Sequence, residues 1–238
     1  MKLTQEEIKN LNEKLANADP ELILSEAVRI FGSNLAFASS LGLEDQILTS
    51  YIARFYPQIT IFTLDTGRLF PESYDLIDRT KSRFKINIQI YFPEQSAVET
   101  MVNSKGINLF YESIENRKLC CKLRKTDSLK RALTGLDAWI TGLRREQSVT
   151  RQNMQIFEMD ESNQMIKINP LLNWTEEEVQ TYVRENNIPY NILHDSGFPS
   201  IGCQPCTRAI EDGEDVRAGR WWWELPDQKE CGLHKAHK

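Results

Sequence analysis

The sequence lacks any apolar run that approaches the roughly 20 residues needed for a membrane-spanning helix. Its first residues are polar and lack the apolar middle of a signal peptide. Net positive charge is also lacking: the formal net charge is −5, which excludes a chain-wide basic field for nucleic acid. We therefore expect a cytoplasmic protein that acts on neither a membrane nor a nucleic acid.

Cysteine is scarce, with five residues among 238. In the cytoplasm structural disulfides are rare, so we interpret the odd count as four metal ligands and one reactive thiol. Cys120 and Cys121 are adjacent, whereas Cys203 and Cys206 have CxxC spacing. Neighbours on a helix point about 100° apart, which suits separate corners of a large cluster better than one small ion. The two pairs therefore favour a [4Fe–4S] cluster over zinc, with buried free thiols as the alternative.

The fifth cysteine, Cys231, stands apart near the end of the sequence, close to Lys229 and His234. A cysteine beside cationic groups can have a lowered pKa and act as a thiolate nucleophile. An incidental surface thiol is the alternative that position alone leaves open.

Short apolar runs alternate with helical patterns over most of the chain. The runs cover residues 34–38, 59–64, 86–92 and 137–141, and each is followed by a polar loop. This alternation predicts an α/β fold with a mostly parallel sheet and helices on both faces, with ligands at the carboxyl ends of the strands.

Helix starts are marked by capping signals. Thr4 with Glu7 and Thr175 with Glu178 have capping-box spacing. Residues 155–158 and 165–168 are expected to form a small hairpin. From residue 197 onward the periodicity disappears, so we divide the chain into an α/β domain (1–196) and a C-terminal functional tail rich in cysteine and tryptophan (197–238).

The loop Ser39–Asp45 follows the first apolar run. Its hydroxyls (Ser39, Ser40), its glycine (Gly42) and the helix start after it would form an anion cradle. It lacks the GK[ST] ending of a P-loop and departs from the SGGxDS-type loop of ATP-pyrophosphatases. A purely structural turn is the alternative.

Basic residues concentrate around the cysteines and strand ends, although the chain is acidic overall. The set comprises Lys122, Arg124, Lys125, Arg144, Arg145, Arg151, Arg208, Arg217 and Arg220. Arginine forks fit phosphate and sulfate oxygens, while a solvated charged surface is the ordinary explanation. The run Trp221-Trp222-Trp223 is expected to pack the tail onto the domain.

Together these motifs resemble the adenylyl-sulfate and phosphoadenylyl-sulfate reductase family, over most of the chain from about Ala36 to His234. The segments that carry the resemblance are Ser39–Asp45, Leu64–Gly67, Cys120-Cys121-x-x-Arg124-Lys125, Thr141–Ser148, Cys203–Arg208, Arg217–Trp222 and Glu230–His234. The resemblance implies an adenine-nucleotide α-hydrolase-like fold with a nucleotide at the strand ends.

The resemblance also implies a mechanism. Cys120, Cys121, Cys203 and Cys206 would hold one [4Fe–4S] cluster, and Cys231 would attack the substrate sulfur to form an S-sulfocysteine. Thioredoxin or glutaredoxin would then release sulfite. The implied substrate-binding residues are Ser39, Ser40, Gly42, Leu64, Thr66, Lys125, Arg144, Arg151, Arg217, Arg220 and His234.

The cluster cysteines favour adenylyl sulfate as substrate, since family members without them use the 3′-phosphorylated form. A phosphoadenylyl-sulfate reductase or a dual-substrate enzyme is the alternative. Two other classes stay open: a zinc-stabilised binding module, and an ATP-pyrophosphatase or adenylyltransferase. The sequence leaves the oligomeric state undecided, a homo-oligomer included.

Overall fold

The structure, a computed structural model, describes residues 3–148 and 151–225. The chain forms two compact units. The first contains residues up to Thr63 together with Asp75–Gln89 and Leu133–Asn191, and the second contains Leu64–Tyr74, Ile90–Ala132 and the residues from Ile192 onward. The predicted division at residue 197 stays a prediction.

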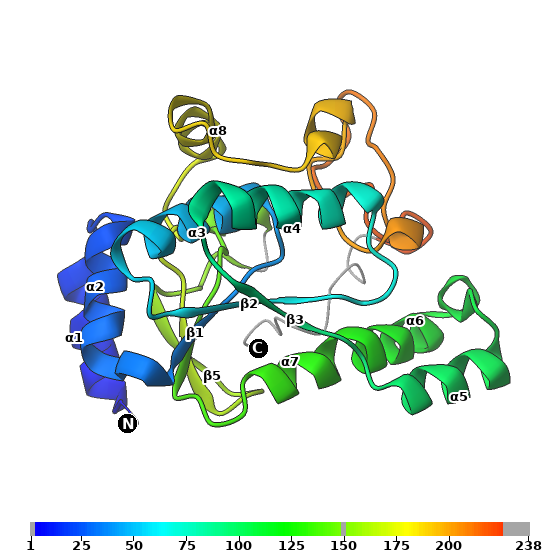
Figure 1. The fold of residues 1–238 in the computed structure, drawn as a ribbon, viewed down its shortest axis with the longest axis horizontal. Coiled ribbons are helices and arrows are strands. Elements are labelled where there is room, and N and C mark those ends of the chain that lie inside the picture. Colours follow the sequence, from blue (N-terminus) through cyan, green and yellow to red (C-terminus); the bar gives the residue numbers. More distant parts are fainter. Residues whose placement is uncertain (1–2, 149–150, 226–238) are drawn as a thin grey trace. The chain divides into compact units, whose positions relative to one another are not determined.

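A six-stranded sheet, in the order β3-β2-β1-β4-β6-β5, runs through the described part of the chain (Figure 1). The strands are β1 (Leu35–Ala38), β2 (Thr60–Leu64), β3 (Ile88–Tyr91), β4 (Ala138–Ile140), β5 (Phe157–Asp160) and β6 (Met165–Ile168). β1 is parallel to both β2 and β4, and β4 is parallel to β6, whereas β5 pairs antiparallel with β6. The predicted α/β class with a mostly parallel sheet is confirmed.

The α-helices of the described residues alternate with the strands over much of the chain. They are α1 (Gln5–Leu15), α2 (Pro20–Phe31), α3 (Leu43–Phe55), α4 (Pro71–Phe84), α5 (Gln95–Lys105), α6 (Ile114–Cys121), α7 (Asp127–Ala132) and α8 (Glu176–Glu185). Both capping boxes are confirmed, because Thr4 and Thr175 each exchange hydrogen bonds with the glutamate three residues later. These bonds satisfy amides that a helix leaves open at its first turn.

The predicted hairpin is present, but its first strand begins at Phe157, two residues later than expected. The Gln155 amide donates to the Glu158 side chain instead of joining a ladder. Phe157 exchanges two hydrogen bonds with the side chain of Asn12 in α1, which occupies the backbone groups of this edge strand at Phe157.

The core of the first unit is formed by the buried strands and by the apolar faces of the helices around them. Phe37 of β1, Ile140 of β4 and Ile47 of α3 have no exposed surface, as the continuous apolar runs of parallel strands predict. No helix in the described ranges is both long and apolar enough to cross a membrane.

Candidate functional site

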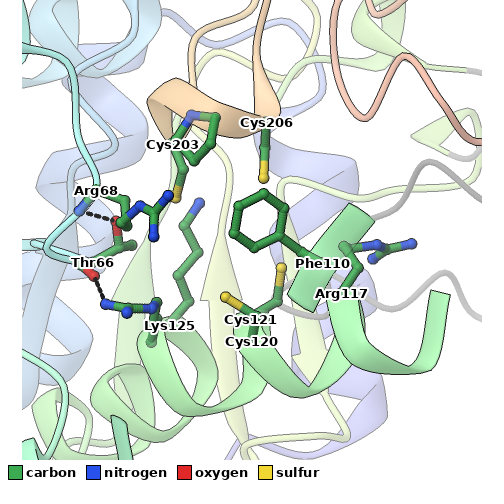
Figure 2. Close-up of a pocket in the computed structure, with 11 residues that line it drawn as sticks. Thr66, Arg68, Phe110, Arg117, Cys120, Cys121, Lys125, Cys203 and Cys206 are labelled. Carbon is green, nitrogen blue, oxygen red and sulfur yellow. Dashed lines mark hydrogen bonds between the residues drawn. The ribbon is translucent and has the colours of Figure 1, made fainter. Parts of the chain in front are cut away.

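Four cysteines line one cavity in the second unit (Figure 2). Cys120 and Cys121 come from α6, and Cys203 and Cys206 from the segment on the opposite side of the cavity. The cavity encloses about 340 Å³, part of it open to solvent. Its wall also carries cationic side chains and apolar groups: Arg68, Arg117, Arg124, Lys125, Phe110 and Pro205. The two cysteine pairs, about eighty residues apart in sequence, are thus brought together.

The vicinal pair lies where the helix changes its winding. Ser113 caps α6, and Cys120 and Cys121 are its last two residues. A π-helical segment, Lys122–Thr126, follows directly and leads into α7, and the Asp127 amide donates to the Lys122 carbonyl. Such π-helical turns are rare in proteins, and many of those that occur lie at functional sites. This one contains Lys125, which lines the cavity, and it was not predicted from the sequence.

The CxxC pair is held by a tight turn. Gln204–Cys206 form a 3₁₀ turn with Pro205 near its start, and the Cys206 amide donates to the Cys203 carbonyl at 2.9 Å. The Tyr111 hydroxyl donates to the Pro205 carbonyl at 2.7 Å. The turn is therefore fixed both by its own backbone and by a side chain from the neighbouring 3₁₀ turn at 109–111.

The loop after β2 joins both cysteine segments. The Thr66 hydroxyl lies 3.2 Å from the sulfur of Cys203, and the Gln204 amide donates to the Arg68 carbonyl at 2.8 Å. On the other side, Arg124 donates to the Thr66 carbonyl at 2.7 Å. Arg124 was noted in a basic cluster and in a motif that carries the family resemblance, but its contact with Thr66 was not predicted, because nothing in the sequence indicates a partner 58 residues away.

Burial makes two of these thiols, Cys120 and Cys206, reluctant to ionise. Burial raises the pKa of Cys206 to about 12, with further increases from the other three cysteines. Burial also raises the pKa of Cys120, against a smaller opposing effect of Arg124. Within the described residues, no three cysteine, histidine or acidic side chains converge closely enough to hold one metal ion. Thiols spread around a cavity, with cations in its wall, suit a larger polynuclear group.

In the first unit, the loop after β1 is organised by a buried carboxylate. Both the backbone amide and the hydroxyl of Ser40 donate to Asp45, at 2.5 and 2.6 Å. Burial raises the pKa of Asp45 to about 6, against opposing hydrogen bonds from Ser40. The Ser40 amide, expected in the anion cradle, is thus already engaged by the protein. Asp45 was not among the predicted site residues, and its place in the loop was the only available signal.

The loop after β4 meets the loop after β1. A methyl group on Gly142 would lie 2.2 Å from an Asp45 oxygen, so only glycine fits there. Arg144, with a side chain only 3% exposed, forms ion pairs with Glu44 at 2.7 Å, Glu146 at 3.4 Å and Glu176. This arginine is occupied by three carboxylates and ties the two loops to the start of α8.

The predicted substrate-binding residues are distributed over both units. Ser39, Ser40, Gly42, Arg144 and Arg151 belong to the first unit, and Leu64, Thr66, Lys125, Arg217 and Arg220 to the second. Arg151 donates to Gln147, whose amide donates to Glu44, so it joins the network around Arg144. Cys231 and His234 lie outside the described residues.

Residues 34–209 match the family described as phosphoadenosine phosphosulfate reductase domain. The chain is 51% identical to the adenosine 5′-phosphosulfate reductase of Allochromatium vinosum over 90% of this chain and 83% of that protein. It is 52% identical to the enzyme of the same name from Burkholderia cepacia, over 83% and 79%.

Some solved structures are similar to this chain in both sequence and fold, and others in fold alone. A phosphoadenylyl-sulfate (PAPS) reductase from Candida auris, in complex with phosphate, has a TM-score of 0.76 and 32% identity over 88% of this chain and 99% of that one. An FMN adenylyltransferase from Candida glabrata has a TM-score of 0.56 at 14% identity, over 100% of this chain and 83% of that one. The second similarity is one of fold alone.

Proposed function

The chain belongs to the phosphoadenosine phosphosulfate reductase family, and we infer that it is an adenosine 5′-phosphosulfate reductase, an oxidoreductase acting on a sulfur group. The named adenosine 5′-phosphosulfate reductases are 51% and 52% identical to it, whereas the solved phosphoadenylyl-sulfate reductase is 32% identical. This difference supports the substrate without a 3′-phosphate.

The observation that carries the proposal is the cavity lined by four cysteines. Cys120, Cys121, Cys203 and Cys206 would hold a [4Fe–4S] cluster, since they surround one cavity without converging on a single point. When bound, the cluster would join the two cysteine segments. It would also place a fixed charge beside the cationic side chains that line the cavity. Lys125 lines the same cavity and would meet the oxyanions of the substrate.

We assign the nucleophile to Cys231. Its thiolate would attack the sulfur of the sulfate group, and the bond between this sulfur and the bridging oxygen would break. AMP would leave with the bonding electron pair, and Cys231 would carry a sulfonate as S-sulfocysteine. The other four thiols would be bound to iron, so Cys231 would be the only cysteine available for this step.

The charge of the sulfate group repels an approaching thiolate, so cations must offset it. The candidates are Lys125, Arg144, Arg151, Arg217, Arg220 and His234. Arg144 is the weakest of them, because Glu44, Glu146 and Glu176 already surround its guanidinium. Ser39, Ser40 and Gly42 from the loop after β1, together with Leu64 at the end of β2 and Thr66 just after it, would contact the nucleotide.

A dithiol protein of the thioredoxin or glutaredoxin class would complete the cycle. One of its thiols would attack the sulfur of Cys231 and release sulfite, and its second thiol would then resolve the mixed disulfide. The two electrons taken up by the sulfur come from this dithiol. The cytoplasm is the compartment that keeps both partners reduced.

The test is anaerobic purification followed by measurement of sulfite release from adenylyl sulfate and from its 3′-phosphorylated form, each with and without thioredoxin. The proposal predicts a brown protein and thioredoxin-dependent sulfite release, faster from adenylyl sulfate. Sulfite release from the 3′-phosphorylated form alone would overturn the substrate assignment, and no release from either would overturn the function.

A further inference from the structure

A buried ion pair lies next to the cysteine cavity. Arg117, on the wall of the cavity one helical turn before Cys120, binds Glu224 through two hydrogen bonds of 2.9 and 2.6 Å (Figure 2 shows Arg117). Their side chains are only 1% and 2% exposed. Desolvating two charges is costly, and such pairs are retained where they fix a specific arrangement. The pair joins α6, which carries Cys120 and Cys121, to the segment that follows Arg220.

Trp221 contacts both Arg117 of this ion pair and Arg220. The guanidinium carbons of Arg117 and Arg220 are each 4.8 Å from the centre of its ring. Its amide donates to the Cys206 carbonyl at 3.1 Å, and its φ of 40° is in the left-handed region that bulky residues avoid. An uncommon backbone conformation persists only where the surroundings over-determine it. Trp221 is therefore held in one position, where its backbone binds the Cys206 carbonyl and its ring contacts both Arg117 and Arg220.

The side chain of Arg220 is also held tightly by its surroundings. It is 7% exposed, it lies against Gly202, and its guanidinium is 3.3 Å from the Ser200 hydroxyl. A methyl group on Gly202 would come within 2.3 Å of it. Gly202 directly precedes Cys203, so contacts from Trp221 and from the segment that leads into Cys203 determine where the Arg220 charge lies.

Resting on the proposed function, in which Arg220 contacts the sulfate group, we propose that Arg117 and Glu224 act as a positioning pair for Arg220. The pair holds Trp221 against the cysteine-bearing helix, and Trp221 holds the guanidinium of Arg220. Breaking the pair lowers the affinity for the sulfate-bearing substrate while leaving the affinity for AMP, which has no sulfate, unchanged. A pair that served only stability would not separate the two affinities.

The test uses the full chain with Cys231→Ser, purified anaerobically, so that adenylyl sulfate binds without turnover. Glu224→Gln keeps the shape of the side chain and removes its charge. Arg117→Met with Glu224→Met removes both charges together and leaves no buried charge unpaired. The matched control is Lys118→Met, which removes an exposed cation from the same helix.

For each protein, calorimetry gives the dissociation constants of adenylyl sulfate and AMP, and iron content and thermal unfolding are measured in parallel. We expect Glu224→Gln and the double methionine variant to retain iron and to bind adenylyl sulfate about tenfold more weakly, the loss of roughly one charge-assisted hydrogen bond. AMP affinity stays within about twofold of the parent in both. Lys118→Met leaves all four readouts unchanged.

Two results would overturn the proposal. One is an unchanged affinity for adenylyl sulfate in the double variant while Arg220→Ala weakens it; the substrate contact would then stand and the positioning role would fall. The other is parallel weakening of both ligands in proportion to lost thermal stability, which marks a purely structural pair. An unchanged affinity in Arg220→Ala would instead refute the contact on which the proposal rests, separately from the reductase activity.

Discussion

Gly202 provides the sharpest single-residue test of the Arg220 assignment. A methyl group at this position would lie 2.3 Å from the Nη2 atom of Arg220 and 2.6 Å from its Cζ atom. Ordinary contact begins at 3.4 Å, so in Gly202→Ala the guanidinium must retreat by about 1 Å. The obstructed atoms are the far end of a flexible side chain, which can move without displacing the backbone.

The expected effect therefore falls on binding and not on folding. A displacement of about 1 Å in a positioned group can cost on the order of 100-fold, and one charge-assisted hydrogen bond contributes about 1.5–3 kcal/mol. We expect Gly202→Ala to bind adenylyl sulfate about 10–100-fold more weakly. Its thermal midpoint should change by no more than about 2 °C, since little packing is lost.

Gly219 supplies the matched control. A methyl group there would also lie 2.3 Å from its nearest neighbour, but that neighbour is the backbone carbonyl oxygen of Arg208. Backbone cannot move aside cheaply, so Gly219→Ala should lower the thermal midpoint clearly. The assay is calorimetric titration with adenylyl sulfate in the Cys231→Ser background, combined with thermal unfolding. Wild-type affinity in Gly202→Ala would refute the reasoning, because the Arg220 charge could then lie elsewhere without consequence.

Three further predictions concern Cys120, Arg144 and Asp45. Cys120→Ser should lose most of the cluster iron, measured per chain after anaerobic purification, and four irons retained would show that Cys120 is not a ligand. Arg144→Met leaves the largely buried Glu44 carboxylate without its cation, whereas Glu146 and Glu176 are more than half exposed and contribute little. The free energy of unfolding in denaturant should therefore fall by about 3 kcal/mol; a loss below about 1 kcal/mol would count against this. The raised pKa of Asp45, about 6, lies above its unfolded value, so its protonation stabilises the fold at low pH and this contribution is lost as pH rises through 6. Relative to Asp45→Asn, wild-type stability should therefore fall between pH 4 and 7 by at most about 3 kcal/mol, and a rise would contradict the assigned burial.

Local signals in the sequence were sufficient for much of the fold. The capping boxes at Thr4 and Thr175 act within one helical turn, and both are confirmed. The buried runs of β1 and β4 are apolar on both faces, so their burial could be predicted without knowing their partners. The start of β5 was predicted too early, because its side-chain partner, Asn12, is more than 140 residues away.

The site was predictable where residue type alone limits the chemistry. Two cysteine pairs in a sequence expected to be cytoplasmic have few uses other than binding metal, and the structure places them around one cavity. The ion pair between Arg117 and Glu224 could not be anticipated, since 107 residues separate its members and neither lies in a motif. Arg144 was assigned to the substrate by the family resemblance, but the structure surrounds it with carboxylates from three segments.

The central claim is that Cys231 is the nucleophile, and mass spectrometry of the intermediate tests it most directly. The enzyme is incubated anaerobically with adenylyl sulfate and no reductant and is then digested. The mass of every cysteine-containing peptide is measured. The account predicts one added SO3 group, about 80 Da, on the Cys231 peptide alone, and its loss as sulfite when thioredoxin is added. The same mass on Cys120, Cys121, Cys203 or Cys206, or sulfite formation by Cys231→Ser at the wild-type rate, would contradict it.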